Sequence, residues 1–132
     1  MIRSVGAVLA GYAVFWLGNA LLFVITGKDP RAENPLEFVM LWLGNGMLCG
    51  VLAGLVAGWL ARRSHGLHGL AVSACIAAGA AIAMTIDPIG ATQFLQWVTI
   101  IVFAPLAWLG AAIWGRRQPL RDQRASAADV EA

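Results

Sequence analysis

Charge is scarce in this sequence: Asp, Glu, Lys and Arg make up 12% of its 132 residues, and 60% are hydrophobic. Soluble domains carry roughly a quarter charged residues, so this composition excludes an ordinary soluble domain. No charged residue interrupts the segments 4–27, 38–61, 64–86 and 88–115. Each of these segments provides the roughly 20 apolar residues that a helix needs to cross a bilayer.

Cysteine is also scarce, since the chain has only Cys49 and Cys75 and no C-x-x-C pair of the kind found in thiol redox enzymes. About a turn near Ser64, the two thiols differ in depth by about 6 Å. Neighbouring helices lie about 8–10 Å apart, so we expect both cysteines to be free.

Ionisable side chains are missing from the middle of every apolar segment. This absence disfavours a proton- or ion-coupled carrier. It also leaves no general base, no nucleophile paired with a base and no cage of metal ligands, so we expect neither catalytic residues nor a cofactor.

The apolar segments predict an all-α, polytopic membrane protein: a four-transmembrane-helix antiparallel bundle over residues 1–117. We place its spans at about 5–26, 38–61, 67–86 and 94–115. The first is longer than the ~7–15 apolar residues of a signal peptide, so we expect it to be uncleaved. A polar segment at 118–132 follows, which we expect to be a disordered cytoplasmic tail.

Basic residues are distributed unevenly between the two ends of this bundle. One end carries Arg3, Arg62, Arg63, Arg116, Arg117, Arg121 and Arg124, and the other carries Lys28 and Arg31 among acidic neighbours. The positive-inside rule therefore predicts both termini in the cytoplasm of a bacterial inner membrane. No basic face on a folded domain accompanies these residues, so the lipid bilayer is an expected partner and nucleic acid is not.

Small residues recur at every fourth position of two neighbouring spans. The second span carries Gly46, Gly50, Gly54 and Gly58, and the third carries Gly69, Ser73 and Ala77. Such a glycine zipper lets helix backbones approach closely in lipid. Because a short turn joins the two spans, we expect their stripes to pack against each other. The alternative is that one stripe forms a homo-oligomer interface.

The tetrapeptide WLGN occurs twice, at 16–19 and at 42–45. Asn19 and Asn45 lie equally far on either side of Ala32, the centre of the first loop, so antiparallel helices place them at one depth. An unpaired carboxamide in hydrocarbon is costly, and we expect the two to form an interhelical clasp. The alternative is a polar pocket in the outer half of the bundle, to which Gln96 and Thr99 would contribute.

Other candidate features have simpler interpretations. His65 and His68 form H-x-x-H, but two histidines do not make a metal site, and we expect none. Trp42, Trp59, Trp97 and Trp114 lie near span ends, as in an interfacial aromatic belt. Pro105 lies inside the fourth span and should kink it or remove one backbone hydrogen bond.

In layout the chain resembles uncharacterised small four-helix bacterial inner-membrane proteins. The resemblance covers residues 1–117 and rests on a short basic start followed by GAVLAGY, the small-residue helix ending in GWLARR, and the basic exit GRR. It implies the fold and the location, and it assigns no functional residue. Our leading hypothesis is a non-enzymatic structural or accessory subunit that binds a membrane-protein partner. The alternative is a small oligomeric transporter or channel that uses the outer polar cluster.

Overall fold

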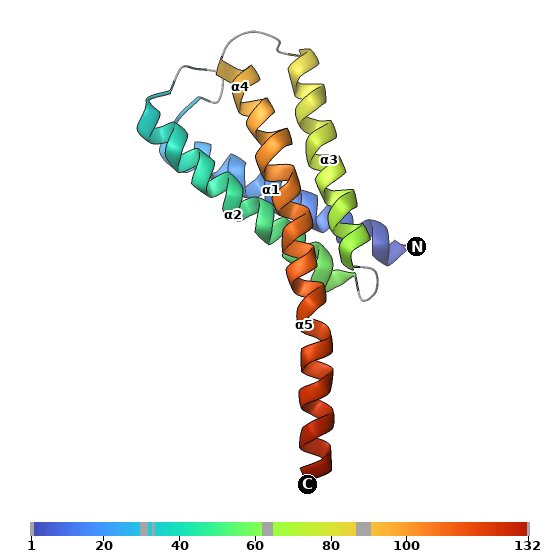
Figure 1. The fold of residues 1–132 in the computed structure, drawn as a ribbon. Helices are drawn as coiled ribbons and strands as arrows, with labels where there is room; N and C mark the ends of the chain where they lie inside the picture. The colour runs from blue at the N-terminus through green and yellow to red at the C-terminus, as the bar shows by residue number, and fades with distance from the viewer. Residues whose placement is uncertain (1, 30–31, 33, 62–64, 87–90, 132) are drawn as a thin grey trace.

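Four helical rods make up the computed structural model of the chain (Figure 1). It describes residues 2–29, 32, 34–61, 65–86 and 91–131, with the side chains of 4–29, 32, 34–61, 65–86 and 93–117. The elements in chain order are α1 (Ile2–Thr26), α2 (Leu36–Leu60), α3 (His65–Ile86), α4 (Ala91–Val98), the π-helix η1 (Thr99–Phe103) and α5 (Ala104–Glu131). Elements α4, η1 and α5 follow one another without a break and form the fourth rod.

Each rod contains a segment long and apolar enough to cross a membrane. These segments are Ser4–Thr26, Leu36–Leu60, His65–Ile86 and Gln93–Arg117. A bilayer offers no hydrogen-bond partners to the backbone, so an apolar segment must satisfy its own N–H and C=O groups as a helix. The prediction from sequence is confirmed: the chain is an all-α, multi-pass membrane protein folded as a four-helix bundle. Beyond the bundle α5 continues as a helix to Glu131, where the sequence predicts a disordered tail.

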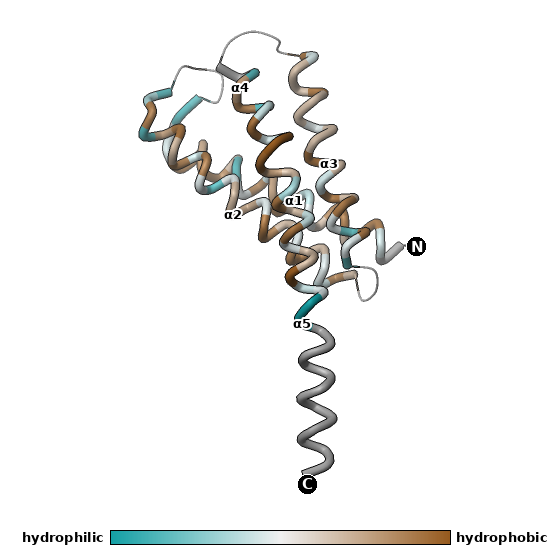
Figure 2. Tube along the Cα trace, viewed as in Figure 1, coloured by the Kyte–Doolittle hydropathy of each residue, from teal (hydrophilic) through white to brown (hydrophobic). Residues whose placement is uncertain are grey.

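The α1–α2 hairpin crosses α3 and α5 obliquely (Figure 1). We call the end at which α1 finishes and α2 and α4 begin the loop end, and the end at which α5 leaves the bundle the tail end. Gly27 follows the last residue of α1 with a positive φ of 63°, the left-handed conformation in which glycine commonly stops a helix. Hydrophilic residues gather at the loop end and on α5 at the tail end, on either side of the mostly apolar rods (Figure 2).

The glycine stripe of α2 packs within the chain, but the expected partner is wrong. A Cβ atom at Gly54 would overlap the carbonyl oxygen of Ala107, and one at Gly50 would lie 2.9 Å from the carbonyl oxygen of Phe103. At Gly58 it would meet the backbone of Ala111 at 3.3 Å. The stripe therefore faces the fourth rod rather than α3.

The third helix also turns its small residues toward the fourth rod. A Cβ atom at Gly69 would overlap Ala111, while Ser73 and Ala77 are half-buried. Chain adjacency was the wrong guide because α5 has a small-residue face of its own, with buried Ala104, Ala107 and Ala111. The small-residue faces of α2 and α3 both pack against the small-residue face of α5, so α5 lies between α2 and α3.

The first helix approaches α2 closely at two glycines. A Cβ atom at Gly11 would lie 2.7 Å from the carbonyl oxygen of Ala53, and one at Gly18 would overlap the Sγ of Cys49. The two copies of WLGN are therefore not equivalent, because Gly44 has no neighbouring atom within 4 Å of an added Cβ. The expectation of free cysteines is met, with Cys49 buried and Cys75 exposed.

We expect Gly54→Leu to destabilise the bundle by at least ~1–3 kcal/mol, because the added side chain meets the backbone of α5, which cannot rotate away. Thermal unfolding in detergent measures the change. Gly44→Leu is the matched control, since the same side chain enters open space on the same helix. This substitution also removes a glycine, which is a poor helix former. Equal unfolding temperatures for the two variants would show that α5 does not rest on the stripe.

Candidate functional site

The two asparagines of the WLGN copies lie close to the same depth, but they do not bond to each other. The Nδ2 of Asn45 donates to the carbonyl oxygen of Gly18 at 3.3 Å, which links α2 to α1. The Nδ2 of Asn19 donates within its own helix, to the carbonyl oxygen of Phe15 at 2.9 Å. The expected side-chain clasp is thus replaced by a bond from one carboxamide to the backbone beside the other.

A cavity of about 120 Å³ lies between the rods in the half of the bundle toward the loop end. We call it the deep cavity. Residues of α1, α2, α3, α4 and η1 line it: Phe15, Trp16, Asn19, Phe23, Trp42, Ile76, Ala80, Leu95, Gln96 and Thr99. Three of the four residues that the sequence assigned to a clasp or pocket, Asn19, Gln96 and Thr99, therefore meet at one cavity, and Asn45 does not line it.

Asn19 carries the most informative polar atom of the deep cavity. The residue is 9% exposed, and its Oδ1 is buried with no hydrogen-bond partner among the described residues. A buried carbonyl oxygen without a partner is unusual, because leaving it unpaired costs about 1–3 kcal/mol. The carboxamide turns its Nδ2 toward Phe15 because an Oδ1 in that position would set two acceptors against each other.

Thr99 enters the cavity from the π-helix. Its hydroxyl donates to the carbonyl oxygen of Leu95 at 2.9 Å, so its oxygen retains lone pairs that can accept. The π-helix itself adjoins Pro105, which has no N–H to donate to a preceding turn. The N–H of Ala104 reaches back to the carbonyl oxygen of Thr99, a spacing of five residues. The sequence predicts a kink or a missing backbone hydrogen bond at Pro105, and the structure has a π-helix just before this residue. A π-helix often occurs at functional sites.

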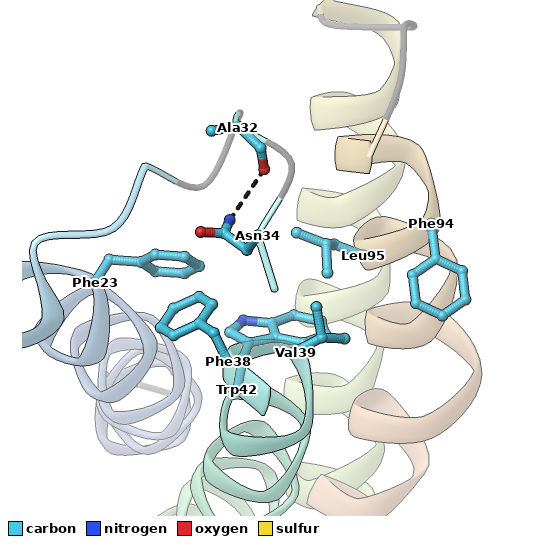
Figure 3. A pocket seen from close by; sticks show the side chains of 8 residues that line it. All are labelled: Phe23, Ala32, Asn34, Phe38, Val39, Trp42, Phe94 and Leu95. Atoms are coloured by element: carbon cyan, nitrogen blue, oxygen red, sulfur yellow. Dashed lines mark hydrogen bonds between the residues drawn. The ribbon is translucent and has the colours of Figure 1, made fainter. Parts of the chain in front are cut away.

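A second cavity, of about 270 Å³, lies at the loop end (Figure 3). Phe23, Trp42 and Leu95 line both cavities, and the remaining walls of this loop-end cavity are Ala32, Asn34, Phe38, Val39 and Phe94. Figure 3 shows Phe23, Phe38 and Trp42 gathered on one side and Leu95 on the other. Asn34 holds the loop above them, because its Nδ2 donates to the carbonyl oxygens of Asp29 and Ala32 at 2.9 and 3.0 Å.

The aromatic walls were not foreseen from the sequence. Trp42 was assigned to an interfacial belt, but it is buried, with its ring centroid 5.0 Å from that of Phe103. Phe15 also packs against Phe103, with 6.0 Å between the two ring centroids. Phe15, Trp16, Asn19 and Phe23 recur at three- and four-residue spacing on α1, and that spacing was the one available signal that they share a face.

The chemistry available at these cavities is that of binding. No ionisable side chain is among the described residues that line them. Over the described part of the chain, no three His, Cys, Asp or Glu side chains gather as metal ligands would. His65 has a structural partner, since its Nδ1 donates to the carbonyl oxygen of Gly58 at 2.7 Å and joins α3 to α2 at the tail end.

Fold and site together define a class: a multi-pass, four-helix membrane protein with a hydrogen-bond acceptor buried at an aromatic cavity between its helices. The comparisons with known proteins add no family to this description. No protein-family model matches the chain, and neither a curated protein nor a solved structure matches it.

We expect Asn19→Leu and Asn45→Leu to have additive effects on stability, because the two side chains share no hydrogen bond in this arrangement. Asn45→Leu should destabilise by about 0.6 kcal/mol, since it removes one interhelical bond. A double-mutant cycle on unfolding in detergent measures the coupling. A coupling above ~0.5 kcal/mol would contradict this arrangement and would favour a direct hydrogen bond between the two asparagine side chains.

Proposed function

We propose that the protein is a non-enzymatic, multi-pass protein of the bacterial inner membrane that binds a small molecule in the deep cavity. The observation that carries this proposal is the partnerless Oδ1 of Asn19 at a cavity it shares with Gln96 and Thr99. Binding sites between bundle helices typically combine apolar walls with a few polar groups, and this cavity has both. A bound molecule would supply the missing hydrogen-bond partner.

Packing toward the tail end favours binding over conduction through a single chain. Below the cavity, Ala53, Val72 and Ala107 are fully buried. The contacts of Gly50 and Gly54 with α5 also leave no room there for a Cβ atom. A molecule that enters from the loop end therefore meets a closed floor. In this proposal the protein is the accessory subunit expected from the sequence, and it responds to the ligand that it binds.

The proposed orientation places the loop end outside the cytoplasm and both termini inside. In its support, the start of α1, the start of α3 and the exit of α5 all lie at the tail end (Figure 1). Arg116 and Arg117 are exposed there, and Lys28 lies beside Asp29 at the opposite end. Basic residues flanking a membrane span favour the cytoplasmic side.

We expect reporter fusions after Lys28 and after Ile89 to be active outside the cytoplasm, and fusions after Ser64 and after Arg124 to be active inside. Paired phosphatase and fluorescent-protein reporters in a bacterial host measure this. The reverse pattern would refute the orientation and would place the loop-end cavity in the cytoplasm.

We expect toluene, a single apolar ring, to bind in the deep cavity of the protein in nanodiscs. A single ring is the size of probe to use, because the volume of about 120 Å³ is slightly below that of an apolar protein cavity of about 150 Å³ that accommodates benzene. In protein labelled with 5-fluorotryptophan, the ¹⁹F resonances of Trp16 and Trp42 should shift and saturate. The resonance of Trp59, which is exposed on α2 and lines neither cavity, should not move.

Two neighbouring alanines of α3 provide a matched pair for the same titration. Ala80 is buried against the deep cavity, so Ala80→Leu should fill it and abolish the saturable shift. Ala81 is exposed, so Ala81→Leu should leave the shift unchanged. The proposal is wrong if Trp16 and Trp42 show no saturable response, or if Ala80→Leu responds like Ala81→Leu.

A further inference from the structure

We infer that the ligand of the deep cavity is an uncharged molecule with an apolar, ring-sized body and one hydrogen-bond donor directed at Asn19. This inference rests on the proposed function and specifies the chemical class of the ligand. It follows from the cavity's polar atoms, its charge and its volume.

The oxygen atoms of Asn19 and Thr99 at the cavity require a hydrogen-bond donor on the ligand. The Nδ2 of Asn19 donates one of its two hydrogens to the carbonyl oxygen of Phe15, whereas its Oδ1, which can only accept, has no partner among the described residues. Thr99 has the same polarity, because its hydroxyl hydrogen is engaged with the carbonyl oxygen of Leu95. The Oδ1 of Asn19 and the hydroxyl oxygen of Thr99 can be satisfied by an O–H or N–H group but not by a carbonyl or ether oxygen. The carboxamide of Gln96 can donate or accept and therefore selects neither.

The absence of charged side chains from the described lining favours an uncharged ligand. Neither a cation nor an anion would find an opposite charge among the described lining residues, and an unpaired ion in an apolar site is strongly unfavourable. Moreover, the rings of Phe15, Trp16 and Trp42 supply flat apolar walls. A volume of about 120 Å³ is close to that of cavities that accommodate one aromatic ring.

A buried water molecule is the competing occupant of the same position. Water also donates to a carbonyl oxygen, and buried water usually makes about three hydrogen bonds to protein groups. A ligand with a hydrogen-bond donor and a bound water molecule predict different affinities for an apolar probe. A permanently held water would leave Asn19 satisfied and would make a donor on the probe irrelevant.

Phenol and toluene are a matched pair of probes, because a hydroxyl replaces a methyl group on the same ring. The protein is titrated with each in nanodiscs, and binding is read from the ¹⁹F resonance of 5-fluorotryptophan at Trp16. Concentrations are corrected for partition into empty nanodiscs of the same lipid. We expect phenol to bind about tenfold more tightly than toluene, the effect of one buried hydrogen bond to an otherwise unpaired acceptor.

Two asparagine variants locate the preference. Asn19→Leu should reduce the phenol-to-toluene ratio to about one by removing the acceptor, whereas Asn45→Leu should preserve it. The Asn45 side chain donates to Gly18 instead of lining the cavity, so this variant controls for a general loss of packing.

Each outcome decides one question. A ratio near ten in the parent protein that is lost only in Asn19→Leu supports the inference. Equal binding of phenol and toluene in the parent overturns the inference and leaves the proposed binding function standing. A ratio that survives Asn19→Leu overturns it as well. Saturable binding of neither probe overturns both the inference and the proposed function.

Discussion

Contact between the glycine stripe of α2 and the backbone of α5 is the constraint on which the rest of the bundle depends. Lipid provides no hydrophobic force to drive two apolar helices together, so association relies on close packing. Gly54 brings α2 against the carbonyl group of Ala107, and Gly46 leaves a space that the ring of Phe103 fills. Phe103 is fully buried as a result, and the rings of Phe15 and Trp42 both pack against it.

The π-helix connects this packing to the cavity. One extra residue in a helical turn rotates the following segment by about 100° relative to an uninterrupted α-helix. Along the fourth rod, η1 separates the face that Ala107 turns to α2 from the face that Gln96 turns to the cavity. Among the described residues the backbone of α4 comes near that of α3 and η1 but not near that of α1 or α2, and both cavities lie between α4 and the α1–α2 hairpin. A straight α-helix through Pro105 would not give both faces their present neighbours.

The sequence was sufficient for the spans because hydrophobic length alone determines which segments cross a bilayer. The partner predicted for Gly46, Gly50, Gly54 and Gly58 was wrong. The prediction relied on chain adjacency and did not consider the small residues of α5. The sequence placed Asn45 one residue from its true contact on α1, since helix rise gives depth reliably. It could not assign the hydrogen bonds of Asn19, because depth leaves open which way a carboxamide faces. Asn19 faces the carbonyl oxygen of Phe15 and, through its Oδ1, the deep cavity.

The partnerless oxygen of Asn19 links stability to occupancy. An empty cavity leaves this acceptor buried and unpaired at a cost of about 1–3 kcal/mol, which a leucine at the same position would not incur. A ligand that binds only the folded bundle stabilises it by RT ln(1 + [L]/Kd), about 2.7 kcal/mol at a hundredfold excess over Kd. That gain is comparable to the cost of the unpaired oxygen. In the proposed function, a ligand that donates to this oxygen would offset its cost on binding, in the way that functional sites commonly depart from the most stable packing.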